Sequence, residues 1–313
     1  MSQYLDPVSL ARLKNLELRA RSVVEGALSG LHRSPHHGSS VEFAEHKEYA
    51  AGDEIKHIDW KAFGKFDKYY VKRFEEETEL RAYLLIDSSA SMGYAHKGGV
   101  SKLDYARMLG ASLAYLLLKQ QDQVGMVAFG ARLRGYLPPR ARSGHLNDLL
   151  TALDGVQAEG RTDLPRALAY LSEVVQRRAL IVLFSDLLGA GLGPSGAAGG
   201  ARAADDNVVR HLLRGLRARK HDVVVFHLLD KDELTLPFEG TTIFESMEDE
   251  RKLLADPGDV RKAYLAELGK FIDGYRTALR EGDVEYHLVD TSLPPADVLV
   301  RFLTGPYRTR GKR

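Results

Sequence analysis

The sequence predicts an α/β fold in which helices cover both faces of a doubly wound, mostly parallel sheet. Five short apolar runs alternate with longer stretches of helical periodicity from residue 80 onward. These runs place apolar residues on both faces of the strand, without alternation, which is typical of strands covered by helices on both faces. Strands and helices that take turns along a chain favour parallel strands joined by crossover helices.

The five apolar runs are the expected strands, and helical spacing of apolar residues predicts the segments between them. The expected strands are residues 82–86, 124–129, 180–184, 223–228 and 284–289. The expected helices are residues 101–120, 144–154, 164–176, 206–219 and 259–281. Ser101, with Asp104 three residues later, resembles a capping box at the start of the first of these helices.

The N-terminal quarter of the chain lacks the alternation of strands and helices that begins at residue 80. Asp6-Pro7 and the apolar spacing after it predict an amphipathic helix at about residues 7–29, which Gly30 is expected to end. The aromatic, turn-rich stretch that follows predicts loops and brief strands. We therefore expect residues 1–78 to pack on the sheet domain rather than fold independently.

Residues 79–305 form the expected sheet domain, with two interruptions. Residues 189–205 are almost entirely Gly, Ala, Ser and Pro, which predicts a flexible surface loop. Residues 230–256 carry turn residues and a short β-prone run, which predicts a small β insertion. Residues 306–313 form a basic tail whose charges we expect to be solvated.

Composition excludes several classes of protein. Lys and Arg total 44 against 43 for Asp and Glu, so no global field would draw the chain to nucleic acid or an anionic membrane. The absence of cysteine removes disulfides, thiolate nucleophiles and Cys-ligated zinc. No apolar run approaches the roughly 20 residues of a membrane span, and the first residues do not resemble a signal peptide. We expect a soluble, cytoplasmic protein without a membrane span or a nucleic-acid partner.

Polar side chains gather where the first expected strand ends. Asp87, Ser89 and Ser91 follow a buried apolar run at alternate positions. In open parallel sheets, ligands bind outside the carboxyl ends of the strands, where these three residues would lie. Oxygen donors of this kind suit Mg²⁺, a small hard ion. The sequence therefore predicts a divalent-metal site at this edge of the sheet.

The Asp-x-Ser-x-Ser run resembles the metal-ion-dependent adhesion site of von Willebrand factor A domains, which have a Rossmann-type sheet. In that family a threonine from a later loop and an aspartate after another strand complete the site, and Thr162 and Asp186 hold the matching positions. The resemblance implies that Ser89, Ser91 and Thr162 bind Mg²⁺, or Mn²⁺ or Ca²⁺, directly, while Asp87 and Asp186 act through water. As an alternative, Asp87 could simply form a turn, and Thr162 or Asp163 could cap a helix.

A second resemblance lies upstream of the sheet domain. It is carried by Gly38-x-x-x-Glu42-Phe43, Tyr49-x-x-Gly52-Asp53-x-x-x-x-Ile58-Asp59-Trp60 and Val71-x-x-Phe74-Glu75. These motifs resemble the signature of the bacterial domain-of-unknown-function family 58, whose members carry a von Willebrand factor A-like domain and are commonly associated with MoxR-type AAA+ ATPases. The resemblance implies a MoxR-type ATPase partner and a role in complex assembly, maturation or stress response.

We expect an interaction module rather than an enzyme, with an acidic residue of a protein partner completing the metal's coordination. A metal-dependent phosphohydrolase is the alternative. Phosphotransfer sites of the haloacid dehalogenase kind require a second Asp two residues after the first, and that position is Ser89. There is no Gly-x-Ser-x-Gly elbow and no Walker A loop. The histidines at positions 32, 36 and 37 are expected to be solvated rather than to bind zinc.

Overall fold

The computed structural model describes residues 8, 10, 15–33, 46–48, 70–72, 80–188 and 198–305. The chain divides into two compact units: Met1–Arg33 together with Leu80–Arg313, and Ser34–Glu79. In the second unit, β1 (His46–Glu48) pairs antiparallel with β2 (Tyr70–Lys72). Most of the family-signature stretch, His36, His37 and residues 306–313 lie outside the described residues.

The first unit is built on a six-stranded sheet, and the predicted doubly wound, mostly parallel α/β fold is confirmed. The strand order is β10-β7-β6-β3-β4-β5, and only β5 runs antiparallel to its neighbour. All five expected strands are present within one or two residues. The strands are β3 (Arg81–Asp87), β4 (Gln123–Phe129), β5 (Leu133–Arg140), β6 (Leu180–Ser185), β7 (Asp222–Leu229) and β10 (Glu285–Asp290).

The sequence did not predict β5, because this edge strand is only partly buried and contains two prolines. A proline lacks the N–H group that an inner strand would use in its ladder, so it is tolerated at an edge. Gly125 allows β5 to approach β4 closely, since a Cβ there would lie 2.7 Å from the Leu137 carbonyl oxygen.

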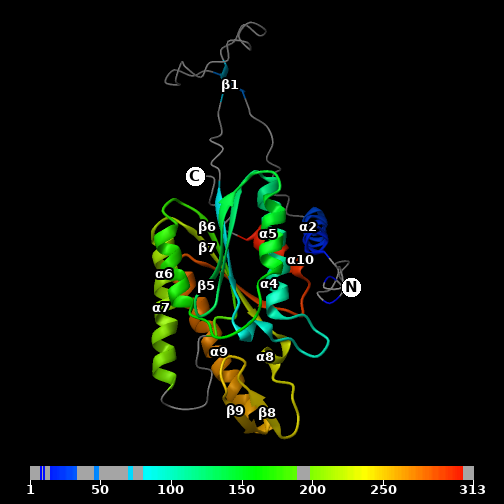
Figure 1. Cartoon of the computed structure of the whole chain (residues 1–313), viewed down its shortest axis with the longest axis vertical. Coiled ribbons are helices and arrows are strands. Elements are labelled where there is room, and N and C mark those ends of the chain that lie inside the picture. Colours follow the sequence, from blue (N-terminus) through cyan, green and yellow to red (C-terminus); the bar gives the residue numbers. More distant parts are fainter. Residues whose placement is uncertain are drawn as a thin grey trace. The chain divides into compact units, whose positions relative to one another are not determined.

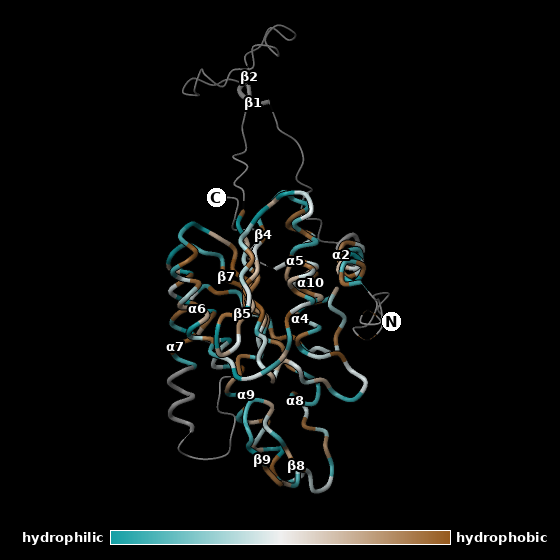
Figure 2. Tube along the Cα trace, viewed as in Figure 1, coloured by the Kyte–Doolittle hydropathy of each residue, from teal (hydrophilic) through white to brown (hydrophobic). Residues whose placement is uncertain are grey.

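Helices cover the two faces of this sheet (Figure 1). On β3, Ala82, Leu84 and Ile86 pack toward one layer of helices, while Tyr83 and Leu85 pack toward the other. Hydrophobic residues accordingly concentrate along the strands (Figure 2). One layer holds α2 (Leu16–Arg33), α4 (Lys102–Lys119), α5 (His145–Asp154) and α10 (Pro295–Thr304), and the other holds α6 (Leu164–Val174), α7 (Ala198–Ala218) and α9 (Pro257–Glu281).

The N-terminal helix differs from its predicted limits of 7–29. Val8 and Leu10 are helical, but Asn15 is not, and its side-chain oxygen accepts a hydrogen bond of 2.8 Å from the Glu17 backbone N–H. An asparagine in this position caps a new helix, which is why α2 begins at Leu16. The helix also continues through Gly30. Helix α2 packs on α4 and α10 and belongs, with all of Met1–Arg33, to the unit that contains the sheet.

Two insertions also differ in detail from expectation. Helix α7 begins at Ala198, inside the segment 189–205 that was predicted to be a loop, because residues 201–204 are mainly alanine, the best helix former. Residues 189–197 lie outside the described residues. The segment 230–256 contains the predicted β element, a hairpin of β8 (Thr242–Glu245) and β9 (Lys252–Ala255), and is preceded by a short helix α8 (Lys231–Thr235).

Among the described residues, no helix combines the length and apolar character that crossing a membrane requires.

The predicted cap of α4 is present in part. The Ser101 hydroxyl accepts a hydrogen bond of 3.0 Å from the Asp104 backbone N–H and donates one of 2.9 Å to the Asp104 carboxylate. We expect Ser101→Ala to lower the free energy of unfolding by about 1 kcal/mol, because it leaves a helix N–H without its acceptor. Urea unfolding followed by circular dichroism measures this loss. Ser172→Ala, which removes a hydroxyl from α6, is the control and should cost less.

Candidate metal centre

Four of the five predicted metal-site residues lie at the carboxyl ends of β3 and β6, which are neighbours in the sheet, and the fifth, Thr162, lies in the loop before α6. From β3 the chain continues to β4 on one side, while β6 lies on the other, so the winding of the sheet reverses between β3 and β6. Asp87 is the last residue of β3, and Asp186 follows the last residue of β6. Such a reversal leaves a crevice in which α/β sheets bind their ligands.

Asp87 is buried and joins three segments of the chain. Its Oδ2 accepts hydrogen bonds from the Ser185 hydroxyl at 2.6 Å and from the Thr162 hydroxyl at 3.4 Å. Its Oδ1 accepts one from the Ser89 backbone N–H at 3.0 Å. Burial and the nearby Asp186 carboxylate raise the pKa of Asp87, while the Ser185 and Ser89 hydrogen bonds oppose the rise.

Backbone contacts bring Thr162 to this edge. The Ala90 N–H donates to the Gly160 carbonyl oxygen at 2.8 Å, and the Glu159 N–H donates to the Ser88 carbonyl oxygen at 3.0 Å. The loop before α6 therefore lies directly against the residues that follow β3.

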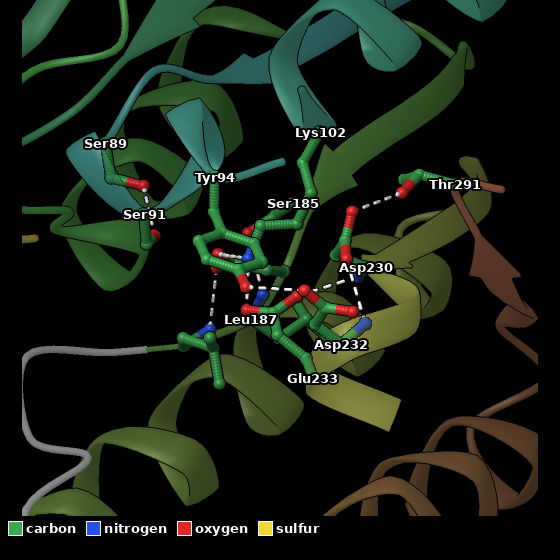
Figure 3. Close-up of polar contacts among 12 residues, drawn as sticks. Ser89, Ser91, Tyr94, Lys102, Ser185, Leu187, Asp230, Asp232, Glu233 and Thr291 are labelled. Atoms are coloured by element: carbon green, nitrogen blue, oxygen red, sulfur yellow. Dashed lines mark hydrogen bonds and ion pairs between the residues drawn. The ribbon is translucent and has the colours of Figure 1, made fainter. Parts of the chain in front are cut away.

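The hydroxyls of Ser89 and Ser91 lie side by side (Figure 3), with their oxygens 3.1 Å apart. In an octahedron with metal–oxygen distances of about 2.1 Å, neighbouring ligand oxygens are about 3.0 Å apart. The separation is therefore compatible with two ligands on adjacent corners.

Asp186 is paired with a buried lysine. The Lys102 ammonium, at the start of α4, lies 2.8 Å from Asp186 Oδ2 and 2.7 Å from Glu233 Oε1 of α8. Figure 3 shows Lys102 extending toward Glu233. Burial alone would lower the pKa of Lys102, but the two carboxylates raise it above its usual value. Burial raises the pKa of Glu233, and the Lys102 charge opposes that rise.

Glu248 is a further carboxylate at the site, on the turn between β8 and β9. Burial, followed by the Asp186 charge, raises its pKa to about 7, and hydrogen bonding by the Ser91 side chain and the Thr162 backbone opposes the rise. One of its oxygens, Oε1, is buried without a hydrogen-bond partner. The hairpin thus contributes an acidic group beside two of the predicted ligands.

The residues present fit a hard divalent cation. Four hydroxyls and four carboxylates gather here around the Lys102 ammonium group, so the ionised cluster carries excess negative charge. A cation would also satisfy the unpartnered Glu248 oxygen. Within the described part of the chain, no three His, Cys, Asp or Glu side chains are arranged to hold a metal. The candidate site therefore depends on hydroxyl oxygens, and metal binding stays a prediction.

Sequence reasoning missed four residues of this cluster: Lys102, Ser185, Glu233 and Glu248. The helical spacing could have indicated that Lys102 is buried, because it lies on the same face of its helix as the buried Tyr105, Ala106 and Leu109. Lysine is seldom fully buried, however, so this spacing alone does not suggest a buried lysine. No feature of the sequence indicates Glu248, which lies in a run of polar turn residues.

Comparisons with known proteins give the family. Residues 45–270 match the family described as "Protein of unknown function DUF58". The uncharacterized protein Rv1480 of Mycobacterium tuberculosis is 27% identical over 247 residues, which cover 78% of this chain and 72% of that protein. The uncharacterized protein Mb1516 of Mycobacterium bovis matches to the same extent.

Two solved structures share low sequence identity with the chain. The conserved hypothetical protein BatB of Bacteroides thetaiotaomicron is 15% identical with a TM-score of 0.42, covering 72% of this chain and 97% of BatB. The VWA domain of SpRpn10 is 11% identical with a TM-score of 0.37, covering 70% of this chain and 93% of that domain. The family match, by contrast, spans well over half of the chain, and on that match the chain belongs to the DUF58 family.

Proposed function

We propose that this protein is a metal-dependent protein-interaction module. Ser89, Ser91 and Thr162 would hold Mg²⁺ directly, and Asp87 and Asp186 would act on it through water. The observation that carries the proposal is the meeting of the Thr162 and Ser185 hydroxyls on one carboxylate oxygen of Asp87, which joins three distant segments at the sheet edge. The resemblance of Asp-x-Ser-x-Ser to a metal-ion-dependent adhesion site supports it.

The bound ion would supply a Lewis-acidic position for a carboxylate of a protein partner, because neutral hydroxyl ligands leave much of its charge unneutralised. The protein's own groups prepare that position. Asp87 orients the Ser89 backbone and the Thr162 side chain. Lys102 neutralises Asp186, so that the nearby carboxylates do not repel an incoming anion as strongly.

Metal binding is tested by titrating Mn²⁺ into the wild type and the Asp87→Ala/Ser89→Ala variant in a calorimeter. We expect the wild type to bind one ion and the variant to lose binding while keeping its far-ultraviolet circular dichroism. Asp148→Ala/Ser172→Ala removes a carboxylate and a hydroxyl elsewhere and should bind like the wild type. Equal heats from wild type and the Asp87→Ala/Ser89→Ala variant would refute the site.

The partner we propose is a MoxR-type AAA+ ATPase, working with this protein in complex assembly, maturation or stress response. Membership of the DUF58 family and the signature stretch before the sheet support this choice. Gel filtration of the protein with the MoxR-type ATPase of the same organism, in Mg²⁺ and ATP, should give a joint peak that the Asp87→Ala/Ser89→Ala variant loses. Using a variant rather than a chelator leaves the nucleotide's own Mg²⁺ in place.

We propose no catalytic role. Ser89 occupies the position that a phosphohydrolase would give to its second aspartate. Turnover of p-nitrophenyl phosphate in Mg²⁺ that disappears in Asp87→Asn would favour the phosphohydrolase instead.

A further inference from the structure

We propose that Glu248 is the chain's own carboxylate ligand for the candidate metal centre, in the position that a partner's carboxylate would take. The inference rests on the metal site proposed above and adds a ligand from the β8–β9 hairpin. It also makes the hairpin a competitor that a partner must displace.

The hairpin turn is attached to the site on two sides. The Arg161 Nε–H, next to Thr162, donates to the Glu248 carbonyl oxygen at 3.4 Å, and the Arg161 guanidinium lies 3.7 Å from the Asp249 carboxylate. On the other side, the Met247 methyl group would lie 3.7 Å from a Cβ placed on Gly93, two residues after Ser91. The turn therefore spans the gap between the two segments that carry the predicted hydroxyl ligands.

The turn has a defined backbone. The Ser246 hydroxyl accepts hydrogen bonds from the N–H groups of Glu248 and Asp249, both at 3.3 Å. The Ser246 N–H donates to the Arg251 carbonyl oxygen at 2.8 Å, and Arg251 pairs with the Asp249 carboxylate at 2.6 Å. These contacts fix the backbone at Glu248, which reduces the entropy cost of placing its carboxylate.

The Glu248 carboxylate itself faces the site. The Asp186 and Asp87 carboxylates raise the pKa of Glu248, and the Ser91 side chain and the Thr162 backbone lower it, so all four residues lie close to this carboxylate. Its Oε1 is nevertheless buried without a partner. A buried carboxylate oxygen that lacks a donor is costly, and a cation held by the same hydroxyls would satisfy it.

A partner's carboxylate would then bind by replacing Glu248. Coordination by Glu248 would hold the hairpin against the sheet edge, and replacement of Glu248 by an outside carboxylate would release it. Metal and partner should therefore change the mobility of residues 242–255 in opposite directions.

The test compares Glu248→Gln with Glu250→Gln, an identical change at an exposed position of the same turn. Mn²⁺ affinity is measured by calorimetry, and amide hydrogen exchange of residues 242–255 is measured with and without saturating Mg²⁺. We expect Mg²⁺ to slow exchange in the wild type and in Glu250→Gln. In Glu248→Gln the slowing should vanish, and the Mn²⁺ dissociation constant should rise about tenfold.

The outcomes separate the two proposals. If Glu248→Gln binds Mn²⁺ with wild-type affinity and shows the same slowing of exchange, Glu248 is not a ligand while the metal site stands. If the wild type binds no Mn²⁺, both the metal site and this inference are overturned. Far-ultraviolet circular dichroism of Glu248→Gln checks folding, which we expect to be retained because the change removes a repelled charge.

Discussion

Lys102→Met is expected to lower the free energy of unfolding by about 3–5 kcal/mol. Lys102 is fully buried, as is Asp186, and the substitution leaves the Asp186 and Glu233 carboxylates without their cation. Removing one partner of a buried ion pair costs this much because the remaining charge stays desolvated. Urea unfolding at pH 7 in the presence of a chelator measures the effect without any contribution from metal.

Two further variants make this result specific. Asp186→Asn in the Lys102→Met background should restore part of the lost stability, because it removes one of the stranded charges. Lys270→Met breaks an ion pair whose side chains are 74% and 72% exposed, and should cost less than about 1 kcal/mol. If Lys102→Met costs no more than Lys270→Met, the buried pair does not stabilise the fold.

His227 is expected to make the fold less stable in acid. Burial lowers the pKa of this β7 histidine to about 4, with the Asp186 carboxylate raising it and the Lys102 charge lowering it further. The usual pKa of histidine is about 6.5. As the pH falls from 6.5 to about 4, the unfolded chain takes up a proton that the folded protein does not. The free energy of unfolding should therefore fall by roughly 3 kcal/mol over this range on account of His227.

His227→Phe tests this dependence, because it keeps a ring against Phe271 and Tyr275 but cannot titrate. At pH 7 the variant should lose some stability, since the Tyr286 hydroxyl loses its partner Nδ1 at 2.6 Å. Between pH 7 and pH 4.5 its free energy of unfolding should fall by about 2–3 kcal/mol less than that of the wild type. His211→Phe, at an exposed position of α7, should show the same change of unfolding free energy with pH as the wild type. If the free energy of unfolding fell equally with pH in wild type and His227→Phe, His227 would not be the source of the acid sensitivity.

The sheet was predictable because each inner strand, buried on both faces, has a mainly apolar sequence without alternation. Strand β5 lacks such a sequence, since none of its residues is fully buried and two of them are Pro138 and Pro139. Local hydrogen bonding also overrode periodicity, as Asn15 shows by starting a new helix inside a continuous apolar pattern.

The candidate site was predictable only where its residues are neighbours in sequence or fit a known pattern. Asp87, Ser89 and Ser91 follow one strand, whereas Thr162 and Asp186 came from a resemblance. The contact of Lys102 with Glu233 joins residues 131 positions apart, and the spacing of apolar residues cannot predict such a contact. Glu248 reaches the site through the geometry of the β8–β9 turn, which the order of residues does not reveal.

The prolines of β5 bear on how another protein could attach to the sheet. Extended segments often bind by adding a strand to a sheet edge, where they pair with free N–H and C=O groups. At Pro138 and Pro139 the outer strand lacks N–H groups, so this edge offers a poor template and is protected from self-association. The opposite edge, formed by β10, contains no proline and is the better template for an added strand.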